Sequence, residues 1–326
     1  MRGALLVAIA VLAAIPLVAS SNVVLNFLVS ALLIALVSQG WNVLGGYGGQ
    51  YSFGHSAFFG TGAYVSAILQ MRYGVNAWIA FCLGIAAGAL LGAIIAALTF
   101  PSGLKGAYFA LVTLAFAEVL RIIASVAPIT GAGVGTLIRL DLRPAAFQFQ
   151  SRVPFYWIVL ALVALSLVIV RSIENSRFGA WLIALRENEA AAKALGIDVT
   201  RIKLQAMTIS AALAAVGGSF YAQYFLFIDA AIAYGPWISV EALLAAIIGG
   251  AGTVAGPLIG ALLIKSLGEL TKTLIGEAPG LDLVVYGSML IVVVAVAPRG
   301  IVGVLSDRSR RSRLAAAGPA MERADA

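Results

Sequence analysis

Long uncharged stretches alternate with short charged ones along this chain. Asp, Glu, Lys and Arg are all absent from residues 3–71, 73–104, 153–170, 204–228, 242–264 and 283–298. A helix needs about 20 apolar residues to cross the hydrocarbon core of a bilayer, so these stretches hold many crossings. Spanning strands of a barrel would instead alternate apolar and polar residues over about ten positions. The pattern predicts an all-α polytopic membrane protein.

Apolar runs between helix-breaking residues predict the individual helices. The predicted ranges are 4–20, 23–44, 55–70, 76–99, 106–127, 153–171, 204–228, an interrupted region at 238–272, and 281–297. Helix 55–70 is short, so a re-entrant segment that does not cross the membrane is the alternative there. In the interrupted region, the glycines from Gly249 onward and the pair Gly256-Pro257 predict a break into two short helices. The chain then has about ten transmembrane helices, some short or broken.

Two polar stretches, residues 172–203 and 298–326, set the expected orientation. Each holds nine charged residues, with arginines and lysines in the first and arginines in the second, which places both on the cytoplasmic side of the membrane. Six crossings before the first stretch place the N-terminus on the cytoplasmic side too. An even number of crossings after this stretch places the C-terminus on the same side. We expect a transmembrane domain at 1–298, with a cytoplasmic loop at 172–203, and a basic, disordered cytoplasmic tail at 299–326.

Composition narrows the class of protein further. Hydrophobic residues make up 62% of the 326 positions and charged residues 11%, with a mean hydropathy of +1.02, which does not fit an ordinary soluble enzyme. The net charge of +7 fits loops beside anionic membrane lipid, and no basic stripe interleaved with aromatic residues points to nucleic acid. No phosphate-binding loop or hydrolase motif occurs. Any active process would therefore draw energy from an ion gradient or from partner subunits.

Glycine gathers at two interruptions, one in each half of the chain. The candidate residues are Gly46, Gly48 and Gly49 in the first interruption and Gly250 and Gly252 in the second. Paired glycine-interrupted segments point to a translocation pathway, because broken helices expose backbone dipoles to a solute. The alternative is close packing of helices through small residues. The sequence leaves both interpretations open.

A few polar residues lie within the predicted spans, where each needs a physical reason. Glu118 and Arg121 are three residues apart on one helical face, so they are expected to neutralise each other and to line an aqueous path. The alternative is a structural pair or an interfacial position near the outer end of the span. Glu241 and Lys265 lie near helix ends and are expected to pair or to reach the interface. His55 is the only histidine and has no further ligands nearby. We expect a hydrogen-bonded helix-end residue there, and no metal site.

The cytoplasmic loop contains the segment ALRENEAAAKALGID, residues 184–198. Its alanines and charges predict one short helix that ends at Gly196. Such a short helix is not stable alone and is expected to dock onto a partner. An ordinary loop helix is the alternative.

Five blocks of the chain resemble, in the same order, the LivM-type permeases of branched-chain amino acid ABC importers. The blocks are residues 45–63 (GGYGGQYSFGHSAFFGTGA), 103–121 (GLKGAYFALVTLAFAEVLR), 186–203 (RENEAAAKALGIDVTRIK), 249–260 (GGAGTVAGPLIG) and 298–303 (PRGIVG). The resemblance implies a permease subunit in the bacterial inner membrane, and not an enzyme. Its expected partners are a second, related permease subunit, two cytoplasmic ABC ATPase subunits and an extracytoplasmic solute-binding protein. ATP and Mg would be bound by the ATPases, and no cofactor by this chain.

In that family the loop equivalent to residues 186–196 is the coupling segment that inserts into a cleft of the ATPase. The resemblance assigns this role to Arg186, Glu187, Glu189, Ala190, Ala191 and Gly196. They are similar to the E-A-A-x-x-x-G signature of the wider importers, although the glycine comes one residue late.

The solute stays open between a branched-chain amino acid, another amino acid, urea, a short amide and an aromatic acid. An ion-coupled secondary transporter is the alternative class of protein. It would need buried carboxylates to carry a proton or sodium ion, and the spans offer only Glu118 and Glu241 for that role.

Overall fold

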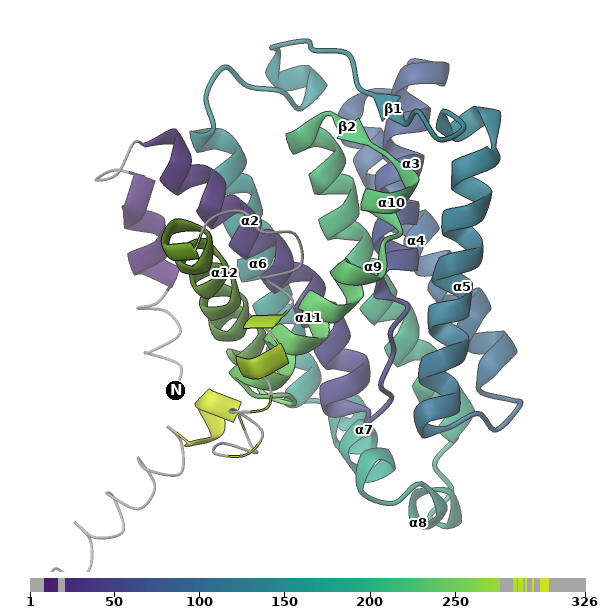
Figure 1. Cartoon of the computed structure of the whole chain (residues 1–326). Helices are drawn as coiled ribbons and strands as arrows, with labels where there is room; N and C mark the ends of the chain where they lie inside the picture. Colours follow the sequence, from purple (N-terminus) through teal and green to yellow (C-terminus); the bar gives the residue numbers. More distant parts are fainter. Residues whose placement is uncertain are drawn as a thin grey trace, which may run out of the picture.

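The computed structural model of the chain describes residues 9–16, 21–275, 284–285, 287–289, 291, 295 and 300–304. These residues are mostly helical and include one two-stranded sheet (Figure 1). Most of the expected helix 281–297 and nearly all of the expected tail 299–326 lie outside the described residues, as do both ends of the expected helix 4–20.

The described helices have bounds close to those predicted from the apolar runs. They are α2 (Asn22–Trp41), continued by a π-helical turn (Asn42–Tyr47), α3 (His55–Tyr73), α4 (Ala77–Thr99), α5 (Gly106–Val126), α6 (Val153–Glu174), α7 (Arg177–Glu187), α8 (Glu189–Ala194), α9 (Val199–Phe225), α10 (Ala230–Ala233), α11 (Pro236–Gly249) and α12 (Gly256–Ile275). Short 3₁₀ turns lie at Pro128–Thr130 and Pro144–Ala146. The predicted break is confirmed, because α11 ends at Gly249 and α12 begins at Gly256.

Six helical segments of the described chain are long and apolar enough to cross a membrane. They are Asn22–Tyr47, Ala77–Thr99, Gly106–Val126, Val153–Glu174, Val199–Phe225 and Ala230–Gly249. Helices α3 and α12 have 19 and 20 residues, about 30 Å at 1.5 Å per residue, and pack in the same bundle (Figure 1). The chain is therefore an all-α, multi-pass membrane protein.

Small residues let α4 lie close to α3 and α9. Gly84, Gly88 and Gly92 recur every fourth residue along α4, and a Cβ added at Gly88 would lie only 2.3 Å from the Cβ of Ala215 on α9. This spacing of glycines is what lets membrane helices approach so closely. Helix α2 packs on another side of α9 and contacts α11 and α12, whereas α5 stands at the opposite edge of the bundle (Figure 1).

The two ends of the bundle differ. Helices α7 and α8 project from one end, which we call the α7–α8 end (Figure 1). The other end, which we call the loop end, carries the long connection between α5 and α6. There β1 (Thr136–Leu137) pairs antiparallel with β2 (Phe227–Ile228), which directly follows α9, so the sheet ties the connection to the bundle.

The prediction of a single helix over residues 184–196 is wrong. Asn188 separates α7 from α8, with φ of −157° and ψ of 101°. Its side-chain oxygen accepts a hydrogen bond from the Ala191 amide at 3.0 Å, which is the usual role of asparagine at a helix N-cap. The polar loop therefore forms two helices meeting at a capped corner.

Candidate functional site

The two glycine-rich interruptions meet in space, and we call residues 42–49 and 249–254 together the glycine junction. The first contains the π-helical turn after α2, and the second begins where α11 ends. A Cβ added at Gly46 would lie 2.5 Å from the backbone nitrogen of Gly252. The two backbones therefore touch, an approach that a side chain at Gly46 would block.

Side chains of α2 and its π-helical turn hold the two halves of the junction together. Asn42 donates from Nδ2 to the carbonyl of Thr253 at 2.9 Å and accepts from the amide of Gly252 at 2.7 Å. Gln39 donates to the carbonyl of Val254 at 2.7 Å. Both side chains are fully buried, and a polar group left unpaired in such a place costs about 1–3 kcal/mol. These bonds therefore fix the junction firmly.

The structure thus brings Gly46 and Gly252 together and supports close packing for this pair. Gly48 and Gly49 lie against α7 instead, and Gly250 follows the end of α11 with φ of +128°. A part in a translocation pathway stays a prediction for all five glycines.

Arg186, near the end of α7, reaches inward to the junction. Its Nη1 donates to the carbonyl of Gly46 at 2.9 Å, and its Nε and Nη2 donate to one carboxylate oxygen of Glu187 at 3.2 and 2.8 Å. Its Cγ would lie 2.6 Å from a Cβ added at Gly49. The segment 177–196, which we call the α7–α8 unit, therefore contacts the junction directly.

Glu189 attaches α8 to the bundle. Its Oε2 accepts from Nζ of Lys203 at 2.9 Å and lies 3.2 Å from Nζ of Lys105. Lys203 also lies over the ring of Phe100, 5.6 Å from its centroid. Partial burial opposes ionisation of Glu189, but the hydrogen bonds and charges of Lys203 and Lys105 outweigh it and hold the pKa of this carboxyl below its ordinary value.

Small and apolar residues are exposed on the α7–α8 unit beside charged ones such as Glu187 and Lys193. Ala190, Ala191 and Gly196 are exposed, and Leu195 is 83% exposed. Gly196 follows α8 with φ of +83°, a conformation that glycine adopts without strain. A leucine held out among small residues forms a knob that a cleft in another protein can receive.

Glu118 and Arg121 form the predicted pair on one face of α5. Nε and Nη2 of Arg121 donate to the two carboxylate oxygens of Glu118 at 2.9 and 2.5 Å. The two side chains remain 46% and 33% exposed, although Glu118 lies about 18 Å along the helix from Gly106. A charge in hydrocarbon at that depth costs about 2.5–3.5 kcal/mol. We therefore expect water or another protein, and not lipid, to cover this face; an aqueous path stays a prediction.

Three further polar residues within the spans, Glu241, Lys265 and His55, have partners inside the bundle. Lys265 on α12 donates to both carboxylate oxygens of Glu241 on α11 at 2.9 Å, which confirms the expected pairing. His55 begins α3, is fully buried and shares a hydrogen bond of 2.8 Å with the hydroxyl of Ser210. Within the described part of the chain, no three metal-ligating side chains come together.

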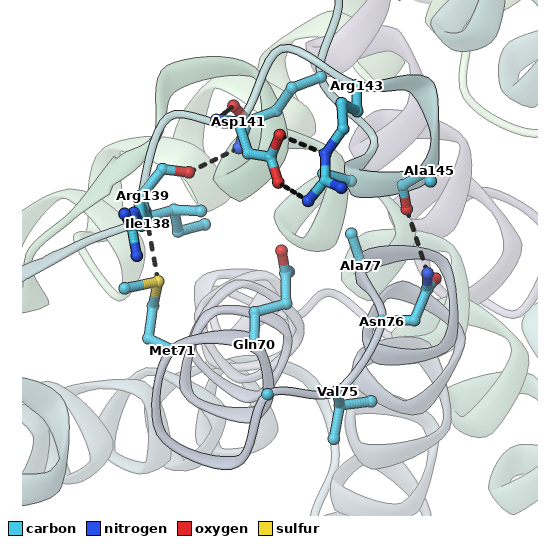
Figure 2. Close-up of a pocket in the computed structure, with 13 residues that line it drawn as sticks. Gln70, Met71, Val75, Asn76, Ala77, Ile138, Arg139, Asp141, Arg143 and Ala145 are labelled. Carbon is cyan, nitrogen blue, oxygen red and sulfur yellow. Dashed lines mark hydrogen bonds and ion pairs between the residues drawn. The ribbon is translucent and has the colours of Figure 1, made fainter.

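A polar pocket of about 410 Å³ opens at the loop end, between the α3–α4 turn and the connection after α5. Figure 2 shows Gln70 directed into it from α3, opposite Arg139 and the pair Asp141–Arg143. Arg143 donates from Nε to Asp141 at 2.7 Å, and this hydrogen bond holds the pKa of the Asp141 carboxyl below its ordinary value. Sequence reasoning missed the pocket, because no pattern in residues 128–152 places that connection over α3.

Comparison with known proteins identifies the family. A family model described as "Branched-chain amino acid transport system / permease component" matches residues 23–294. The chain belongs to this family. It is 29% identical, over 307 residues, to the high-affinity branched-chain amino acid transport system permease protein LivM of Escherichia coli (strain K12), with 83% of this chain and 68% of that protein covered. It is 27% identical, over 269 residues, to the probable permease protein LivH of Methanocaldococcus jannaschii, with 78% and 83% covered.

The chain is thus a permease component of an ABC importer, a transport subunit and not an enzyme, and the LivM-type resemblance is confirmed. Membership of this family sets aside the alternative of an ion-coupled secondary transporter. No solved structure matches the chain significantly.

Sequence reasoning missed the side chains that connect these parts: Gln39, Asn42, Lys105, Leu195 and Lys203. Gln39 and Asn42 did leave a signal, because polar residues three apart in an apolar helix share a face. Leu195 also left a signal in the sequence, because it is an apolar residue beside a predicted helix end. Lys105 and Lys203 left no such signal, because only the fold brings them to their common partner Glu189.

Proposed function

We propose that this chain is one of two related permease subunits of an ATP-driven importer of branched-chain amino acids in the bacterial inner membrane. Membership of the family and the names of its LivM and LivH relatives support this proposal. Two cytoplasmic ATPases, which bind ATP and Mg, and an extracytoplasmic solute-binding protein complete the complex. This chain itself holds no cofactor.

The helices are consistent with ten crossings. The six apolar segments, α3 and α12 account for eight, and the expected helices 4–20 and 281–297 add two. The basic residues of the α7–α8 unit place that end in the cytoplasm. Both termini then lie in the cytoplasm, and the loop end faces outward.

The α7–α8 unit is the coupling segment in this proposal. Its exposed knob at Leu195 meets the ATPase, while Glu189 and Arg186 attach the unit to the bundle. Closure of the ATPases on ATP moves the unit, tilts the helices and opens the pathway to one face of the membrane at a time.

The loop end suits the solute-binding protein. Val134, Leu137 and Leu140 are exposed there, and the pocket below them is edged by Arg139 and Arg143 (Figure 2). Apolar side chains mixed with arginines are typical of protein interfaces.

The exposed ion pair on α5 is the observation that carries the placement of the pathway. This chain covers Glu118 and Arg121 only in part, and hydrocarbon would penalise both charges. We place the pathway along this face of α5, between this chain and the second permease subunit. Because the binding protein selects the solute, the pathway needs only to admit it.

Labelling of cysteines on α5 tests this placement. In a Cys82→Ser background, Ile122→Cys, one helical turn from Glu118 on the same face, should react with a charged thiol reagent in the assembled complex, because the pathway holds water. Leu165→Cys on α6 is the matched control, since Leu165 and Ile122 are similarly exposed at 56% and 49%, and it should stay unreactive against lipid. An unreactive residue 122, or equal labelling at both positions, contradicts the placement.

A further inference from the structure

We propose that Arg186 is the positioning residue that transmits movement of the α7–α8 unit to both halves of the glycine junction. The inference deepens the proposed function, because it rests on the α7–α8 unit being moved by a partner. It assigns to Arg186 a contact within this chain, in place of the contact with an ATPase that its position in the loop implies.

The guanidinium lies between the two halves of the junction. Its Nη1 binds the carbonyl of Gly46 in the π-helical turn at 2.9 Å, and the same nitrogen would lie 3.1 Å from a Cβ added at Gly252. The first half of the junction precedes α3 and the second precedes α12. One side chain from α7 therefore touches the backbones that lead into two separate transmembrane helices.

The geometry requires arginine. Nε and Nη2 bind Glu187 while Nη1 binds Gly46, so the fork is held by its neighbour and aimed at the junction. A lysine ammonium has no such rigid fork, so it does not reproduce the separate positions of these three donor nitrogens. The stem packs where a side chain at Gly49 would clash, which leaves the guanidinium little freedom to turn away.

Asn42 completes the connection. It follows α2 in the same π-helical turn as Gly46, and it holds Gly252 and Thr253 by two hydrogen bonds. A displacement of α7 that pulls on Gly46 therefore also strains the bonds to the segment before α12. The junction opens as one unit when α7 moves away.

Hydrogen–deuterium exchange on the complete complex in lipid nanodiscs tests the connection. In Arg186→Ala and Arg186→Lys, amides of residues 42–50 and 250–255 should exchange about tenfold faster than in the wild type, because a charge-assisted bond is lost. Asn42→Leu should speed exchange at residues 250–255 without altering the α7–α8 unit. Lys193→Ala, an exposed change on α8, should leave the junction unchanged.

Uptake and ATPase activity of the same variants complete the test. Arg186→Ala and Asn42→Leu should lower solute uptake per ATP hydrolysed while the ATPases stay bound. Unchanged exchange in Arg186→Ala, or faster exchange with normal uptake per ATP, overturns the inference. The exchange measurement reads this chain alone. Unchanged exchange would therefore contradict the role of Arg186 even if the ATPase docks on the α7–α8 unit. Loss of ATPase docking would contradict the proposed function and leave the contacts of the junction intact.

Discussion

One carboxylate, Glu189, fixes where α8 lies against the bundle. Its principal partner Lys203 has only 5% of its side chain exposed, whereas its second partner Lys105 is 61% exposed. An exposed ion pair contributes little to stability, but a cation held away from water needs its counter-charge. The contact with Lys203 therefore dominates the attachment, and Lys105 assists.

This pair predicts a pH dependence. The lysines hold the pKa of Glu189 below its ordinary value of 4.5, so the ionised form stabilises the attachment above that value, and the attachment is lost as pH falls through the lowered pKa. A spin label at Ala191→Cys, in a Cys82→Ser background, should keep constant mobility from about pH 7 to 5 and become mobile at lower pH.

The matched control is Glu189→Gln, which should leave the label mobile at every pH because the amide carries no charge. Mobility that rises between about pH 7 and 5 in the wild type, or a label held equally well in Glu189→Gln, contradicts this account of the attachment.

At the scale of elements, the sequence predicts the spanning helices well and their mutual contacts poorly. Uncharged runs give α2, α4, α5, α6 and α9 within a few residues, because the length of a crossing is imposed by the bilayer. The break between α11 and α12 follows from the chemistry of Gly and Pro.

Long-range contacts account for what the sequence leaves out. The meeting of Gly46 with Gly252 and the inward direction of Arg186 depend on how helices pack, and uniformly apolar faces carry no periodic signal for packing. The corner at Asn188 is different. Its capping side chain is a local signal, which the surrounding run of alanines and charges concealed.

The α7–α8 unit gives a prediction about docking. Leu195→Asp should greatly reduce the amount of ATPase that co-purifies with the permease, because a charge replaces the exposed apolar knob. Folding should be unaffected, since residue 195 is 83% exposed. Val134→Asp, at the loop end and 82% exposed, should retain the ATPase fully. Full retention in Leu195→Asp would show that the ATPase binds elsewhere.

At the scale of the whole molecule, three features are spread from the loop end to the α7–α8 end. The loop end holds a polar pocket, a partly exposed ion pair lies partway along α5, and a protruding unit at the opposite end contacts the junction between helices. Within the described residues the charges at membrane depth are paired. In the proposed function, the chain supplies a path and a means of moving it, and partner ATPases supply the energy.

Uptake of radiolabelled leucine by proteoliposomes that contain the complete complex and its binding protein tests this central claim most directly. The account predicts uptake that requires hydrolysable ATP on the side of the α7–α8 unit and that continues when ionophores collapse all ion gradients. Uptake by this chain without the ATPases, or uptake abolished by the ionophores, would contradict it.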